Sequence, residues 1–157
     1  MGLFGTKKVA EKETTIQDCV RMIESFLKKG KMTPSDHRLP DPDTLGWWLQ
    51  RGSARIYIVL NQQDDINTVR VFSPILYLPN DHVLPFYRRC LEMNMSLLQC
   101  AFAATEDTIG LVSERPIKGL DEHELENLLL YLSRVADDVD NVLANEFQAK
   151  LYLEGQR

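Results

Sequence analysis

The sequence lacks the motifs that most nucleotide-binding proteins and zinc enzymes require. Its eight glycines are scattered, and no P-loop or GxGxxG pattern occurs, so no phosphate-binding loop is expected. The three histidines, His37, His82 and His123, lie far apart and form no HExxH pair. We therefore expect no catalytic site, no metal and no cofactor.

Cysteines and long apolar runs are also scarce. Cys19, Cys90 and Cys100 are odd in number and have no CxxC spacing, which excludes a disulfide framework and a zinc site. Each has apolar neighbours, so we expect buried thiols in a reducing compartment, the cytoplasm. No apolar run is long enough for a membrane span and no apolar h-region for secretion is recognisable, so we expect a chain that is neither exported nor transmembrane.

Basic charge is in short supply. The chain has 18 Lys and Arg against 23 Asp and Glu, a formal net charge of −5. Nucleic acids and anionic membranes attract basic surfaces, so neither is an expected partner. The acidic residues are dense beyond position 121, which indicates a solvated helix face or, as the alternative, a surface for a basic partner.

The sequence does contain eight segments in which apolar residues recur at a regular spacing. Helical spacing predicts helices over 15–29, 81–95 and 121–143, while alternation predicts strands over 45–50, 54–61, 68–78, 97–104 and 108–114. The order α-β-β-β-α-β-β-α predicts an α+β fold with an antiparallel five-stranded sheet. We expect a flexible arm over 1–14, a single domain over 15–147, and a helix extension or frayed tail over 148–157.

The strands are apolar on both faces. The third strand carries Val69 and Val71 on one side and Phe72 and Leu76 on the other. An antiparallel sheet with one wet face should instead alternate cleanly between apolar and polar residues. We therefore expect that a second copy or a partner covers part of the apolar surface.

The Trp47-Trp48 pair is the most unusual dipeptide. Adjacent strand residues point to opposite faces, so one ring can fill the core while the other contacts a partner or lies under a helix. Both alternatives stay open, and so does the choice of ring. Aromatic residues are enriched where proteins bind proteins. We predict a partner-binding surface on the sheet and the first helix, formed by Trp47, Trp48, Tyr57, Val59, Ile23 and Phe26.

Several of these segments carry a family resemblance. They are the strand pair around Trp48 and 56–60, the Phe72-Ser73-Pro74 strand, the helix over 84–95, the hairpin over 98–112, and Gly119-Leu120-Asp121 before the last helix. Together they resemble the YbjN-related branch of the type III secretion chaperone-like (CesT-like) fold. The long proline-bearing connection over 31–43 departs from the secretion chaperones.

The resemblance implies a small, acidic, bacterial, cytoplasmic homodimer without a catalytic site. The secretion chaperones among such proteins bind an extended client segment along the sheet and first helix, and the YbjN branch is associated with regulatory or peptide-binding roles. The resemblance also implies a dimer contact through the helix between the third and fourth strands, here Val83, Leu84, Tyr87, Leu91 and Met95.

Two functions follow as hypotheses. The first is a non-catalytic, chaperone-like module that binds a peptide or protein client in extended form. The second is a self-associating structural or regulatory subunit without a peptide client.

Overall fold

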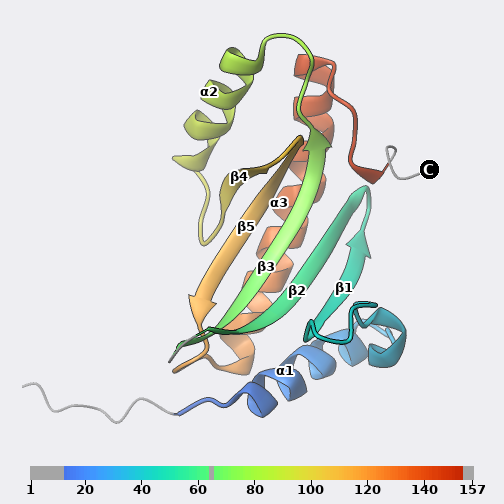
Figure 1. Cartoon of the computed structure of the whole chain (residues 1–157), viewed down its shortest axis with the longest axis vertical. Coiled ribbons are helices and arrows are strands. Elements are labelled where there is room, and N and C mark those ends of the chain that lie inside the picture. The colour runs from blue at the N-terminus through green and yellow to red at the C-terminus, as the bar shows by residue number, and fades with distance from the viewer. Residues whose placement is uncertain (1–12, 64–65, 154–157) are drawn as a thin grey trace, which may run out of the picture.

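The elements of the structure follow the predicted order. The computed structural model describes residues 13–63 and 66–153. The elements are α1 (Ile16–Lys29), the short 3-10 helix η1 (Pro34–His37), β1 (Gly46–Arg51), β2 (Ala54–Gln63), β3 (Ile66–Tyr77), α2 (Val83–Asn94), β4 (Ala101–Thr105), β5 (Thr108–Pro116) and α3 (Glu122–Phe147). The strands form one five-stranded antiparallel sheet in the order β1-β2-β3-β5-β4, with α3 behind it (Figure 1). The predicted α+β fold is confirmed.

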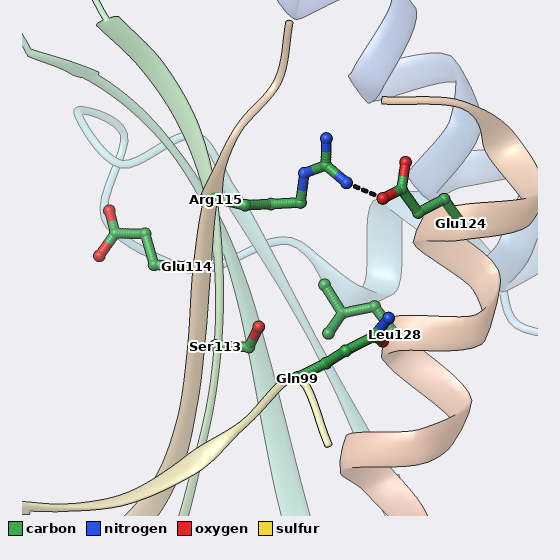
Figure 2. A pocket seen from close by; sticks show the side chains of 6 residues that line it. All are labelled: Gln99, Ser113, Glu114, Arg115, Glu124 and Leu128. Carbon is green, nitrogen blue, oxygen red and sulfur yellow. Dashed lines mark hydrogen bonds and ion pairs between the residues drawn. The ribbon is translucent and has the colours of Figure 1, made fainter. Parts of the chain in front are cut away.

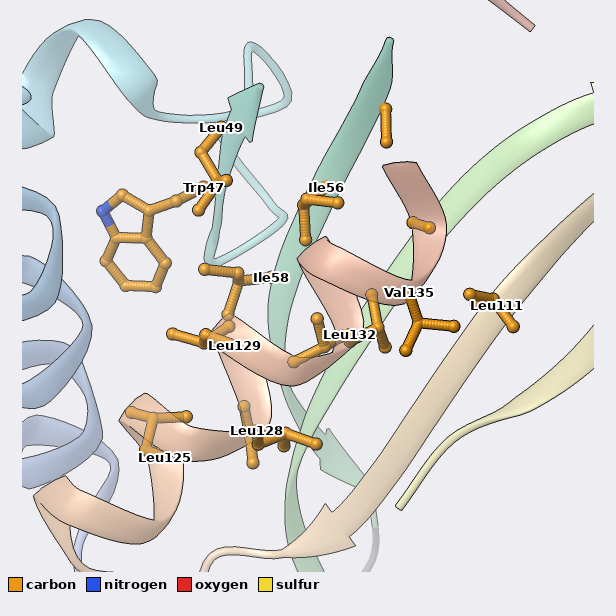
Figure 3. Close-up of a cluster of buried hydrophobic side chains, with 14 of the residues drawn as sticks. Trp47, Leu49, Ile56, Ile58, Leu111, Leu125, Leu128, Leu129, Leu132 and Val135 are labelled. Carbon is orange, nitrogen blue, oxygen red and sulfur yellow. The ribbon is translucent and has the colours of Figure 1, made fainter. Parts of the chain in front are cut away.

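The core lies between the sheet and α3. Alternate residues of the sheet point toward α3. They pack against an apolar stripe of α3, whose residues recur at helical spacing (Figure 3). Both sets are buried: Trp47, Leu49, Ile56, Ile58 and Leu111 from the sheet, and Leu125, Leu128, Leu129, Leu132 and Val135 from α3. Burying each such side chain contributes about 1.5–3 kcal/mol, so this layer holds the fold together.

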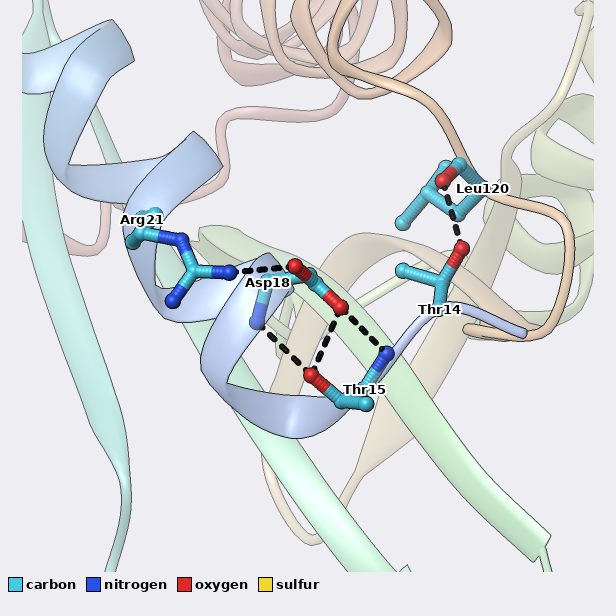
Figure 4. Close-up of polar contacts among 5 residues, drawn as sticks. All are labelled: Thr14, Thr15, Asp18, Arg21 and Leu120. Carbon is cyan, nitrogen blue, oxygen red and sulfur yellow. Dashed lines mark hydrogen bonds and ion pairs between the residues drawn. The ribbon is translucent and has the colours of Figure 1, made fainter. Parts of the chain in front are cut away.

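Helix α1 joins the α3 side of the sheet. It begins with a capping box, in which Asp18 N donates to Thr15 Oγ1 at 3.1 Å and Thr15 N donates to Asp18 Oδ2 at 2.9 Å (Figure 4). The hydrogen bond that Thr15 Oγ1 donates to Asp18 Oδ2 at 2.6 Å, the one from Thr15 N and the charge of Arg21 hold the pKa of Asp18 below its ordinary value. Thr14 Oγ1 donates to the Leu120 carbonyl at 3.0 Å, so the chain is anchored from this point. Most of the predicted N-terminal arm, residues 1–12, lies outside the described residues.

Helix α2 presents only a narrow apolar side to the core. The stripe of Leu84, Leu91 and Met95, predicted as a dimer contact, is exposed in the single chain. Phe86 is fully buried instead, edge-on to the Phe147 ring at 5.1 Å between centroids. Helix α2 packs on β4 and on the end of α3 through this narrow side, so the stripe stays free of contacts with the core.

Strand β4 is shorter than predicted. It begins at Ala101 rather than at 97, because Gln99 has a left-handed φ of 59° and Leu98 N donates to the Tyr131 hydroxyl of α3 at 2.9 Å. As a result β4 pairs only with residues 108–112 of β5.

The C-terminal segment returns to the sheet. Helix α3 ends at Phe147, and Gln148 follows with a left-handed φ of 53°. Tyr77 N then donates to the Lys150 carbonyl and Tyr152 N to the Ile75 carbonyl, both at 2.9 Å. Residues 148–153 of the predicted tail therefore turn back to β3 and do not extend the helix, while residues 154–157 lie outside the described residues. Within the described ranges, no helix has the length and apolar character needed to cross a bilayer.

Asp140 is a buried carboxyl group on α3. The residue is 0% exposed, and its Oδ2 atom has no hydrogen-bond partner. Burial raises the pKa of Asp140 above its ordinary value of 3.8, and the charge of Asp137 adds to this, against hydrogen bonds from Ser53 and Asn141. A buried carboxylate with one oxygen left without a partner destabilises the folded state at neutral pH.

The substitution Asp140→Asn tests this cost. The folded chain holds the Asp140 proton more tightly than the unfolded chain, so this contribution to stability is present below pH 3.8 and is lost as the pH rises through the raised pKa. From about pH 4 to neutral, we expect the free energy of unfolding of the variant to gain about 1–3 kcal/mol relative to the wild type. Urea unfolding across this range measures it, with the exposed Asp138→Asn as control. Parallel pH profiles for the wild type and Asp140→Asn would contradict the account.

Candidate functional site

The side of the sheet turned away from α3 is termed the open face. Since strand residues alternate, the neighbours of the buried side chains point to this side. In the view of Figure 1, no described helix lies in front of it. Its larger side chains are Trp48, Arg55, Tyr57, Val59, Arg70, Phe72, Val112 and Glu114, all on β1, β2, β3 and β5.

An apolar row crosses the open face from edge to edge. The strand register places Trp48 opposite Tyr57, Tyr57 opposite Phe72, Phe72 opposite Val112, and Val112 opposite Ala101. All five are half-buried, because each shields the edges of its neighbours. With strands about 4.8 Å apart, the row spans about 19 Å.

The central ring of the row lies over a glycine. A Cβ atom added at Gly110 would come within 2.5 Å of the Ser73 carbonyl oxygen and 2.6 Å of the Phe72 ring. Any larger residue at position 110 would therefore clash with the Phe72 ring and the neighbouring backbone. The row is a preformed surface rather than a loose group of side chains.

Charged groups flank the row on both sides. The Arg55 guanidinium lies 4.6 Å from the Trp48 ring centroid. On the opposite side of the row, Arg70 Nη1 pairs with Glu114 Oε2 at 3.8 Å. The His37 ring of η1 lies 4.8 Å from the Trp48 ring, with its Nδ1 atom 2.8 Å from the Trp48 carbonyl oxygen. Trp48 is thus the most heavily contacted member of the row.

The predicted partner-binding residues divide between two places. Trp48, Tyr57 and Val59 lie together on the open face. Trp47 and Ile23 are 0% exposed in the core, so they are corrected to structural residues. Phe26 is half-buried on α1, in the layer behind the sheet.

Sequence reasoning missed Phe72 and Val112 as site residues. The two-sided pattern of the third predicted strand already turned Phe72 away from Val69 and Val71. What the pattern did not give was the register that aligns Phe72 with Tyr57 and Val112.

A small polar hollow lies between β5 and α3 (Figure 2). Its volume is about 220 Å³, and its lining comprises Gln99, Ser113, Glu114, Arg115, Glu124 and Leu128. The ion pair between Arg115 and Glu124 spans one side. No histidine is among these lining residues, so a Ser–His pair of the hydrolase type is absent from the hollow.

The remaining reactive groups are inert or dispersed. Burial raises the pKa of Cys19, Cys90 and Cys100 to about 11, which keeps the thiols protonated and weakly nucleophilic at neutral pH. Over residues 13–63 and 66–153, no three His, Cys, Asp or Glu side chains gather closely enough to hold a metal ion.

A second apolar surface lies on α2 and is termed the α2 stripe. Leu84, Leu91 and Met95 are 72%, 66% and 89% exposed, and Tyr87 is 36% exposed. An apolar groove of about 240 Å³ separates this helix from β4, lined in part by Leu91 and Phe102. The predicted dimer-contact residues therefore lie on one accessible side of the molecule, except Val83, which is half-buried.

The fold defines a class of small α+β domains with helices on one side of an antiparallel sheet. A family model described as T3SS (YopN, CesT) and YbjN peptide-binding chaperone 1, TY-Chap1, matches residues 18–155. The chain belongs to this family. Among curated proteins, none matches the sequence.

One solved structure that is similar to this chain is the crystal structure of YbjN from E. coli. The two share 13% sequence identity, with a TM-score of 0.45. The alignment covers 84% of this chain and 95% of the YbjN chain.

Proposed function

We propose that this protein is a non-catalytic, chaperone-like module that holds an extended peptide segment on the open face. The observation that carries the proposal is the apolar row of Trp48, Tyr57, Phe72, Val112 and Ala101. The family description as peptide-binding chaperones supports it.

The dimensions of the row suit an extended chain. A strand rises about 3.3 Å per residue, so about six residues cross the 19 Å row. Alternate side chains of that segment face the sheet, which gives about three apolar side chains to bury against the aromatic rings. Because the apolar row is preformed, little free energy is lost in ordering its side chains when a peptide binds.

Substitution of the two central rings tests the proposal. Peptides are selected from a random display library on the wild-type protein, and affinities are measured by fluorescence anisotropy. We expect Tyr57→Ser and Phe72→Ser each to weaken binding about tenfold, because each removes an aromatic contact of at least about 1.5 kcal/mol. Leu130→Ser is the matched control, since Leu130 is an apolar residue of α3 that is 45% exposed.

Circular dichroism and melting curves establish that each variant is folded. Wild-type affinity in both Tyr57→Ser and Phe72→Ser would contradict peptide binding on the open face. An equal loss of affinity in Leu130→Ser would contradict it as well.

The α2 stripe favours a second candidate function, self-association. Leu84, Tyr87, Leu91 and Met95 are exposed on one side of a helix, and contiguous exposed apolar patches often mark protein–protein contacts. We propose that Leu84, Tyr87, Leu91 and Met95 form a homodimer contact in a cytoplasmic protein. A dimer that binds no peptide would support a structural or regulatory subunit instead of the chaperone-like module.

A further inference from the structure

Arg55 is a half-buried cation without a carboxylate partner. Five arginines in the described part of the chain pair with Asp or Glu: Arg21, Arg70, Arg88, Arg89 and Arg115. Arg38, Arg51 and Arg134 have no such pair, but all three are exposed to water. Arg55 differs from both groups, because it is half-buried and also unpaired.

The guanidinium group of Arg55 is poorly satisfied by the protein. It carries five N–H donors. Its Nη2 atom donates to Gln50 Oε1 at 3.4 Å, near the long limit for a hydrogen bond. Its Nε atom is buried and has no partner. The buried Nε donor costs free energy but is out of reach of solvent, so an acceptor from outside the chain would bind the Nη1 and Nη2 donors.

Stacking on Trp48 fixes the group without satisfying it. The guanidinium carbon lies 4.6 Å from the ring centroid. Such a cation–π contact uses none of the N–H donors, which remain available to an acceptor. The contact therefore holds the donor edge in position for a planar acceptor, and a carboxylate matches it in a bidentate manner.

The location of Arg55 joins it to the proposed peptide site. It precedes Tyr57 by two residues on β2, so both side chains project from the open face about 7 Å apart. The other arginine beside the row, Arg70, is already paired with Glu114. A carboxylate next to an apolar side chain of the bound segment would thus meet Arg55.

We propose that Arg55 binds a carboxylate of the client, so that the open face selects extended segments carrying an acidic group beside apolar side chains. This inference rests on the proposed peptide-binding function and specifies the chemistry of the partner. The carboxylate belongs to an aspartate or glutamate side chain or to a peptide C-terminus.

Parallel selections on wild-type and variant proteins test the inference. A random-peptide display library is selected on the wild type, Arg55→Gln, Arg55→Glu and Arg134→Gln. The last is a matched control, because Arg134 also stacks on an aromatic ring, that of Tyr131 at 5.6 Å, but on the other layer. We expect acidic residues at a fixed spacing from apolar residues on the wild type and the control. That enrichment should vanish with Arg55→Gln and turn basic with Arg55→Glu.

Synthetic versions of the selected peptides give the magnitude and the source of the carboxylate. Replacing glutamate by glutamine should weaken binding to the wild type about tenfold and leave binding to Arg55→Gln unchanged. A matching loss when a free C-terminal acid becomes an amide would assign the carboxylate to the C-terminus instead.

Two results would overturn the inference, and they are distinguishable. Peptides that bind through Tyr57 and Phe72 but show no acidic preference would remove the role of Arg55 and leave the proposed function intact. Failure of the wild type to enrich any peptide would contradict the proposed function, and this inference with it.

Discussion

Replacing Trp47 with alanine should lower the free energy of unfolding by about 3–5 kcal/mol. The ring is 0% exposed and packs into the core beside α1 and α3, with the Arg38 guanidinium 4.5 Å from its centroid (Figure 3). Its removal leaves a cavity that the surrounding strands and helices fill only in part. Urea unfolding followed by circular dichroism measures the loss.

The adjacent Trp48→Ala substitution is the natural control. Trp48 is half-buried on the open face, so its loss should lower the free energy of unfolding by only about 1–2 kcal/mol. The same substitution should weaken peptide binding, which Trp47→Ala does only through unfolding. Equal stability losses for the two tryptophans would contradict the assignment of one ring to the core and the other to the site.

The double substitution Leu84→Glu with Leu91→Glu should convert the proposed homodimer to a monomer. A two-fold interface contains each position twice, so the variant places four carboxylates in one contact. Burying unpaired charges is costly, and we expect the dissociation constant of the dimer to rise at least about 1,000-fold. Analytical ultracentrifugation over a concentration series measures it.

The folded state and the peptide site should survive this change. Both leucines are already exposed in the single chain, at 72% and 66%, so the glutamates disturb no packing within it. Leu130→Glu on α3 serves as the control for an exposed leucine outside the stripe. An unchanged sedimentation profile in the double variant, or a wild type that is monomeric at all concentrations, would exclude the α2 stripe as the dimer contact.

Local sequence patterns were sufficient for the order of the elements. Period-two alternation marked β2 and β3, and helical spacing with an acidic N-cap at Asp121 marked α3. These patterns depend on neighbouring residues in the sequence, so they can be recognised without knowledge of the packing. They also placed Trp48, Tyr57 and Val59 near one another.

Local patterns could not predict which side of each helix or strand faces the core. Alternation showed that Trp47 and Trp48 point to opposite faces, but the position of α3 decides which face is the core. Helix α2 is apolar on two sides, and contact with Phe147, far along the chain, selects Phe86 over Leu84. The apolar row depends on strand register, which arises from pairing over long sequence separations.

The most direct test of the central claim uses the two tryptophans as reporters. The chain contains two, one in the core and one in the apolar row, so fluorotryptophan labelling gives two fluorine NMR signals. Trp48→Phe assigns them by removing one signal. On addition of a selected peptide, the Trp48 signal should shift in step with binding while the Trp47 signal stays in place. A peptide that binds by anisotropy but leaves the Trp48 signal unmoved would show that the client is held elsewhere and not on the open face.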